Sequence, residues 1–109
     1  MALILFSHAA VNVVTPGTEV QIDTEKRPCT SIIIQAKNSN TGLIYVGDST
    51  VSSANGLELN PGEALEIVGD DRNDGQADET VLADLWIDAA VGGEGVKIAY
   101  YKKRPNGIL

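Results

Sequence analysis

Hydrophobic and polar residues alternate along most of the chain, and a period of two is typical of strands in a β-sheet. In the segment 18–23, for example, Val20 and Ile22 share one face while the residues between and beside them are polar. This pattern indicates an antiparallel strand with one buried and one solvated face. Helical spacing is nearly absent, apart from one possible turn within 76–82. The sequence therefore predicts an all-β fold.

Turn-forming residues divide this pattern into short strands. Pairs such as Asn55-Gly56, Pro61-Gly62 and Asn106-Gly107 supply the fixed or positive φ angles that tight turns require. The predicted strands are 2–6, 10–15, 18–23, 30–37, 43–47, 57–59, 63–68, 82–89 and 95–103. Strands of this length and spacing favour an antiparallel β-sandwich, and a jelly roll is the first choice of topology.

Two pairs of consecutive strands are predicted to form hairpins. The β-branched segment 30–37 indicates a strand buried on most of both faces, joined to 43–47 by the polar turn between them. The glycine-rich residues 92–95 would join 82–89 to 95–103 in the same way. A phosphate-binding loop at 92–95 is disfavoured, because such loops precede a helix and a strand follows here.

The outward face of the second hairpin holds the most informative aromatic residue. Alternation places Trp86 on the polar face, between Asp84 and Asp88. Cross-strand pairing would bring Trp86 near Tyr101 and would oppose the two carboxylates with the lysines of the last strand. Exposed aromatic residues rimmed by charges are typical of interface anchors, and an ordinary sheet surface is the alternative.

The two ends of the sequence are candidates for contacts with other subunits. Residues 2–6 are continuously apolar and no nearby turn fixes their partner, so they could pair with the sheet of a neighbouring subunit. The basic tail, residues 102–109, could dock on an acidic neighbour or be solvated. From the ends and the aromatic residues, the candidate interface residues are Leu3, Ile4, Leu5, Phe6, Tyr45, Trp86, Tyr101, Lys102, Lys103 and Arg104.

Length and charge narrow the function classes. A chain of 109 residues is long enough for one hydrophobic core and too short for two, so residues 1–109 are expected to form one domain. The net charge of −7 argues against binding to nucleic acid or to anionic membranes. The first six residues lack the basic start and long apolar run of a targeting segment, and no stretch approaches the roughly 20 apolar residues of a membrane span.

Candidate chemistry is sparse. His8 and Cys29 are the only residues of their types and lie far apart in sequence, so we expect no enzyme activity, metal or cofactor. We expect Cys29 to pack as a small apolar side chain. Because a single cysteine cannot form a disulfide within the chain, we also expect the protein to mature in a reducing compartment. The acidic segment 70–79 suggests calcium, but Arg72 and Val81 stand where a calcium loop carries ligands, which favours a solvated loop.

One segment carries a resemblance to a known class of proteins. Residues 40–63, with the run Ile44-Tyr-Val-Gly-Asp48 followed by Asn55-Gly56 and Pro61-Gly-Glu63, resemble small virion structural proteins of tailed bacteriophages. The resemblance continues more loosely through 85–89 and 93–100. It implies a compact, often jelly-roll-like β-sandwich that attaches to the capsid as a decoration or cement subunit, or sits in the tail.

This resemblance implies a location and partners. A decoration subunit binds the major capsid protein on the outer capsid surface after assembly in the bacterial cytoplasm, and symmetry matching to the shell favours a homotrimer. Residues 2–6 and 102–109 would then supply strand exchange or docking, with Tyr45, Trp86 and Tyr101 as anchors. The alternative is a phage tail or adhesin domain that binds host carbohydrate by stacking on Trp86. A cupin-like enzyme is disfavoured, because such sites use several histidines.

Overall fold

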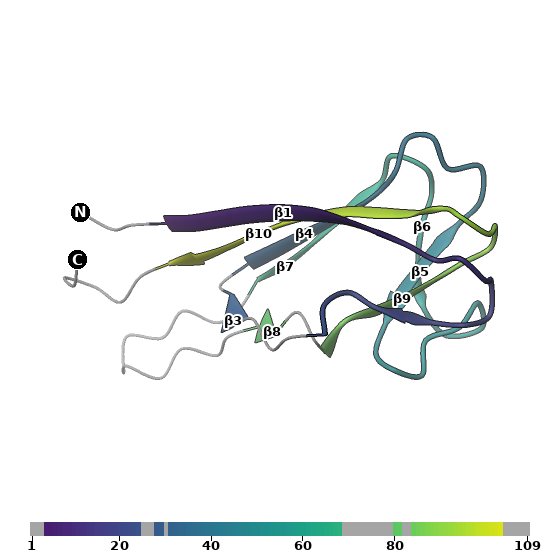
Figure 1. Ribbon diagram of the computed structural model, residues 1–109, viewed down its shortest axis with the longest axis horizontal. Helices are drawn as coiled ribbons and strands as arrows, with labels where there is room; N and C mark the ends of the chain where they lie inside the picture. The colour runs from purple at the N-terminus through teal and green to yellow at the C-terminus, as the bar shows by residue number, and fades with distance from the viewer. Residues whose placement is uncertain (1–3, 25–27, 30, 69–79, 82–83, 104–109) are drawn as a thin grey trace.

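The computed structural model describes residues 4–24, 28–29, 31–68, 80–81 and 84–103. In this part of the chain all regular structure is strand, every strand pair is antiparallel, and no α-helix is present. The strands form two four-stranded sheets and one separate two-stranded pair. The predicted all-β class is therefore confirmed, and the two sheets are those of a sandwich (Figure 1).

The first sheet, called sheet A, contains the longest strands. Its strands, in spatial order, are β1 (Ile4–Asn12), β10 (Gly95–Lys103), β4 (Ser31–Ala36) and β7 (Ala64–Val68). Sheet B contains, in spatial order, β2 (Val20–Gln21), β9 (Trp86–Ala89), β5 (Ile44–Gly47) and β6 (Leu57–Leu59). The separate pair is β3 (Pro28–Cys29) with β8 (Thr80–Val81).

The core lies between sheets A and B and is made by alternate residues of each strand. In β4, Ile32 and Ile34 are fully buried, whereas Ile33 between them is 40% exposed. The prediction that this strand is buried on most of both faces is therefore wrong, because sheet A has one face toward sheet B and one face outward. The buried core cluster comprises Val13, Ile22, Ile32, Ile34, Ala36, Ile44, Val46, Leu59, Ile87, Ala89, Val96 and Ile98.

Neither predicted hairpin forms. Strand β4 pairs with β10 and β7 in sheet A, while β5, the next strand in the chain, pairs with β6 and β9 in sheet B. Strands β9 and β10 are likewise in different sheets. Crossing from one sheet to the other lets consecutive strands bury their apolar faces against each other, which a flat hairpin would not do. The strand order confirms an antiparallel β-sandwich, and the jelly-roll topology expected from the sequence stays a prediction.

The N-terminal segments predicted as two strands form one. Strand β1 runs without interruption from Ile4 to Asn12 and pairs along its whole length with β10 of the same chain. Residues 4–6 thus extend the chain's own sheet, opposite residues 101–103. The helical turn expected within 76–82 lies mostly outside the described residues, and the part that is described, Thr80–Val81, is strand β8.

Polar side chains hold the turns together at one end of the sandwich. The buried Asn40 donates from Nδ2 to the carbonyl of Gly95 at 2.9 Å and accepts the Gly95 amide at 3.3 Å. The Glu94 carboxylate accepts the Gly42 amide at 3.0 Å, and the Thr41 amide and hydroxyl at 2.6 and 3.0 Å. These hydrogen bonds, that of the Gly42 amide foremost, lower the pKa of Glu94. The turn after β4 is therefore fixed against the turn before β10.

Candidate docking surface

The chain's own loops cover the centre of the outer face of sheet B, where Tyr45 lies opposite Asp88. The segment 48–56, between β5 and β6, folds back over Tyr45, which is 8% exposed, and buries Val51 beside it. The fit is close, because a Cβ atom at Gly56 would lie 2.7 Å from Tyr45 Cβ and 2.8 Å from Val51 Cγ2. Tyr45 is therefore part of a small second cluster outside the main core, and it is not available as the exposed anchor that the sequence suggested.

The second covering loop lies over Asp88. This residue is 3% exposed, and its Oδ1 atom accepts the Gly17 amide at 3.0 Å and the Ala89 amide at 2.8 Å. Gly17 reaches this position through a turn closed by the Thr18 amide and the Thr15 carbonyl, in which its φ of 87° suits glycine. Asp88 thus fastens the 15–18 loop to sheet B, and the prediction that it opposes the lysines of β10 is wrong.

Trp86 and Tyr101 do not meet in the way the sequence suggested. Trp86 lies opposite Gln21 and Gly47 in sheet B, whereas Tyr101 lies opposite Ser31 in sheet A. Both aromatic side chains are partly buried. Their predicted pairing is wrong because it rested on a β9–β10 hairpin, and these two strands belong to different sheets.

The outer face of sheet A is open in the described part of the chain. We call it the A face and define it by the described side chains that alternate outward from its four strands, together with Lys37 directly after β4: His8, Ala10, Asn12, Ser31, Ile33, Gln35, Lys37, Ala64, Glu66, Val68, Lys97, Ala99 and Tyr101. The cross-strand pairs His8 with Ala99 and Ala10 with Lys97 set small residues beside long ones. The alanine methyl groups are therefore the floor of an open hollow of about 550 Å³, which Ile33 and Lys97 also line.

Charge is distributed unevenly over the two faces. Among the residues whose side chains are described, the formal cations are Lys37 and Lys97, and both lie on the A face, where Lys37 Nζ donates to Asn12 Oδ1 at 2.6 Å. The described carboxylate on this face is Glu66, which accepts the Ser31 hydroxyl at 3.3 Å. The remaining described carboxylates are on sheet B or in loops and turns, at Glu19, Asp23, Asp48, Glu58, Glu63, Asp84, Asp88 and Glu94.

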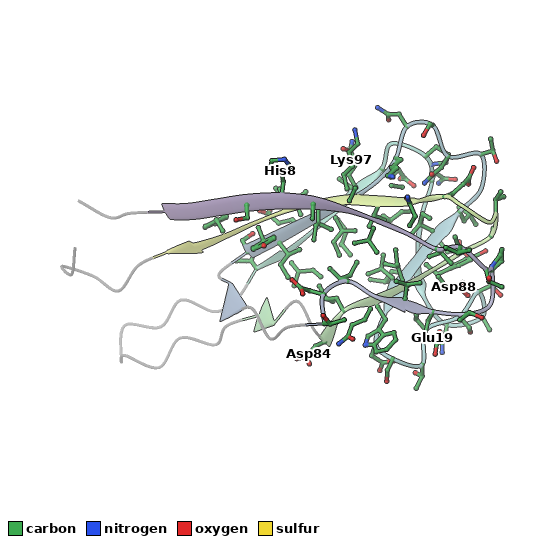
Figure 2. All side chains as sticks on the ribbon, in the orientation of Figure 1. His8, Glu19, Asp84, Asp88 and Lys97 are labelled. Carbon is green, nitrogen blue, oxygen red and sulfur yellow. The ribbon has the colours of Figure 1, made fainter. Side chains whose placement is uncertain are left out.

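Figure 2 shows the same separation in space. His8 and Lys97 project from the side of the molecule formed by sheet A, while Glu19 and Asp84 lie on the opposite side. The chain as a whole carries a net charge of −7. The A face is therefore a locally cationic and partly apolar surface on an acidic protein, and a surface of this kind complements an acidic one.

The other candidate residues lie along the border of this face or beyond the described residues. Ile4, Leu5 and Phe6 are in β1 and pair with the backbone of β10, where Lys102 and Lys103 also lie. Leu3 and Arg104, with the rest of the C-terminal tail, lie outside the described residues.

Sequence reasoning missed the centre of the A face. Ile33 lies in a continuous apolar run that predicted burial, and Ala10 has no chemical group that marks it as a surface residue. The usable signal was the strand period, since Ile33 must face away from Ile32 and Ile34.

The described residues contain no group of three or more histidine, cysteine, aspartate or glutamate side chains arranged to hold a metal ion. A helix long and apolar enough to cross a membrane is not found among them either. No protein-family model matches the sequence, and comparison with curated proteins finds no match.

Proposed function

We propose that this protein is a structural protein of a bacteriophage virion, a decoration or cement subunit that binds the outer surface of the major capsid lattice. The observation that carries the proposal is the open A face, which is cationic and partly apolar, on a sandwich whose other outer face is covered by loops at its centre. A protein that works by adhesion needs a surface of this kind. The resemblance of residues 40–63 to small phage virion proteins supports the same function.

The proposed mechanism is passive. The A face lies on the junction between neighbouring shell subunits, where Ile33 provides apolar contact and Lys37 and Lys97 face acidic groups of the shell. Association of several copies adds avidity, so that each weak contact contributes to holding the lattice. The role requires neither catalysis nor a cofactor, and it places the protein on the outer capsid surface after assembly in the bacterial cytoplasm.

The carbohydrate-binding alternative would use Trp86 on the outer face of sheet B. That indole is partly buried, and Tyr45, the other described aromatic residue that points outward from this sheet, is covered by a loop. A stacking site with one half-buried ring has little area for a sugar. The geometry therefore favours docking through the A face over sugar binding at Trp86.

The first test is the copy number of this chain in purified particles from its source, measured by quantitative mass spectrometry against the major shell protein. We expect about one copy per shell subunit, in keeping with the symmetry of the lattice. A handful of copies per particle would replace the capsid location with the tail or neck. Complete absence from particles would overturn the virion proposal, and glycan-induced changes in Trp86 fluorescence would then support the alternative.

The second test compares the A face with an exposed site elsewhere, using a matched pair of variants. Ile33→Asp places a charge on the A face, and Leu57→Asp makes the same change in the edge strand β6 of sheet B, at a residue that is 61% exposed and lies outside the A face. We expect Ile33→Asp to weaken co-sedimentation with particles at least about tenfold, as loss of a central apolar contact does. Leu57→Asp should bind like the unsubstituted protein. Equal binding by both variants would exclude the A face as the docking surface.

A further inference from the structure

The two sheets have four edge strands, and three of them are protected against pairing with other chains. An edge strand exposes unpaired backbone N–H and C=O groups, which short length and charged side chains normally shield. Strand β7 has five residues and carries Glu66, and β6 has three and carries Glu58. Strand β2 has two residues and is flanked by Glu19 and by Asp23.

Strand β1 has none of these protective features. It is nine residues long and contains no lysine, arginine, carboxylate or proline. Its register with β10 is continuous from Ile4 opposite Lys103 to Asn12 opposite Gly95, so no bulge turns the edge away. Residues 7–10 are all exposed, although alternate members of this segment point toward the interior side of the sheet. This edge is open to strand addition.

The hydrogen bonds at the end of β1 show which backbone groups face outward. The Val13 amide donates to the Glu94 carbonyl at 2.9 Å, and the Val13 carbonyl accepts the Gly93 amide at 2.7 Å. In an antiparallel pair, residues alternate between bonding toward the partner strand and bonding away from it. The odd-numbered residues of β1 therefore bond toward β10, and the N–H and C=O groups of Phe6, His8 and Ala10 face the free edge.

We propose that β1 pairs in antiparallel fashion with β1 of a second copy of this chain, joining the two A sheets into one continuous sheet. A register centred on His8 pairs the full length of both strands, and its two-fold symmetry makes the contact self-complementary. The chain carries a net charge of −7, so two copies repel where their carboxylates meet. Strand β1 contains no carboxylate, lysine or arginine, so pairing there brings no like charges of that strand together.

This contact does not depend on the proposed capsid function. It produces an even-numbered assembly, in place of the trimer that symmetry matching favours. It also sets two A faces side by side in one surface, which would strengthen any docking through that face by avidity.

The test uses the full chain and sedimentation velocity over a range of concentrations. Ala10→Pro removes an N–H group that faces the free edge, and proline is tolerated on an edge strand where that group does not bond to the neighbouring strand. Ala10→Thr is the matched control, since it keeps the N–H group and favours a strand. We expect the unsubstituted protein and Ala10→Thr to dimerise. Ala10→Pro should raise the dissociation constant at least about tenfold, because each copy loses a hydrogen bond.

A second measurement keeps the proposal testable if Ala10→Pro fails to fold. In the unsubstituted protein, the amides of Phe6, His8 and Ala10 should exchange slowly with deuterium at high protein concentration and rapidly after dilution. A monomer at all concentrations, or a dimer or trimer in which these amides exchange rapidly, would overturn the proposal. Ile33→Asp distinguishes the two hypotheses, because it should weaken particle binding and leave the dimer intact.

Discussion

The outer faces of sheets A and B are built from similar alternating strands, but they differ in how far loops of the chain cover them. On sheet B, the segments 15–18 and 48–56 fold back over the strands and bury Asp88 and Tyr45. On sheet A, the described residues leave Ile33 and the neighbouring alanines open to solvent. Outward residues of sheet B therefore serve the stability of the fold, whereas those of sheet A are free to serve binding. Substitutions on the two faces should separate these roles.

The largest expected difference is between Tyr45 and Ile33. Tyr45→Ala removes a buried aromatic side chain beneath the 48–56 loop and should lower the free energy of unfolding by about 3–5 kcal/mol. Ile33→Ala removes a side chain that is 40% exposed and should cost about 1 kcal/mol or less. Urea denaturation of the three proteins measures both changes. Similar losses for both variants would mean that the faces do not differ in their contribution to stability.

A smaller effect is expected from the carboxylate that fastens the 15–18 loop. Asp88→Ala removes the part-buried hydrogen bond that the Gly17 amide donates to the carboxylate and should lower the free energy of unfolding by about 1–3 kcal/mol. Asp88→Asn keeps an oxygen that can accept this amide, so it should retain most of the stability. Asp84→Ala, at an exposed residue four positions away, is the control and should change little. Thermal denaturation of the set would contradict this role if Asp88→Ala matched Asp84→Ala.

The smallest expected effect concerns Glu94, at the end of the sandwich where neither outer face is involved. Amide and hydroxyl donors from Gly42 and Thr41 lower the pKa of Glu94 below its ordinary value of 4.5. A carboxylate with a lowered pKa in the folded state stabilises the fold above its unfolded-state pKa, and this contribution is lost as the pH falls through the lowered value. As the pH is lowered from about 6 to about 3, the midpoint temperature of unfolding should therefore fall less steeply for Glu94→Gln than for the unsubstituted protein. If the midpoint temperatures of the two proteins fell equally with pH, Glu94 would make no such contribution to stability.

The strand positions could largely be predicted because alternation and turn residues are local properties. Segments 43–47, 57–59 and 63–68 match β5, β6 and β7 to within a residue. The candidate site was predicted less well. Tyr45 and Asp88 were expected at the surface, since nothing in their own strands indicates that distant loops cover them, and Ile33 was expected in the core because its run of isoleucines conceals the strand period.

The sequence by itself determined that this protein is all-β and where most of its strands begin and end. Side-chain period and turn chemistry depend on a few neighbouring residues, so they can be recognised without knowledge of the fold. Only the tertiary structure decided that β4 and β5, and likewise β9 and β10, separate into different sheets, and that one outer face is covered while the other is open. Sheet partners and loop packing depend on contacts between residues far apart in the chain. Among the possible arrangements, the one that buries the apolar faces of both sheets most completely is favoured.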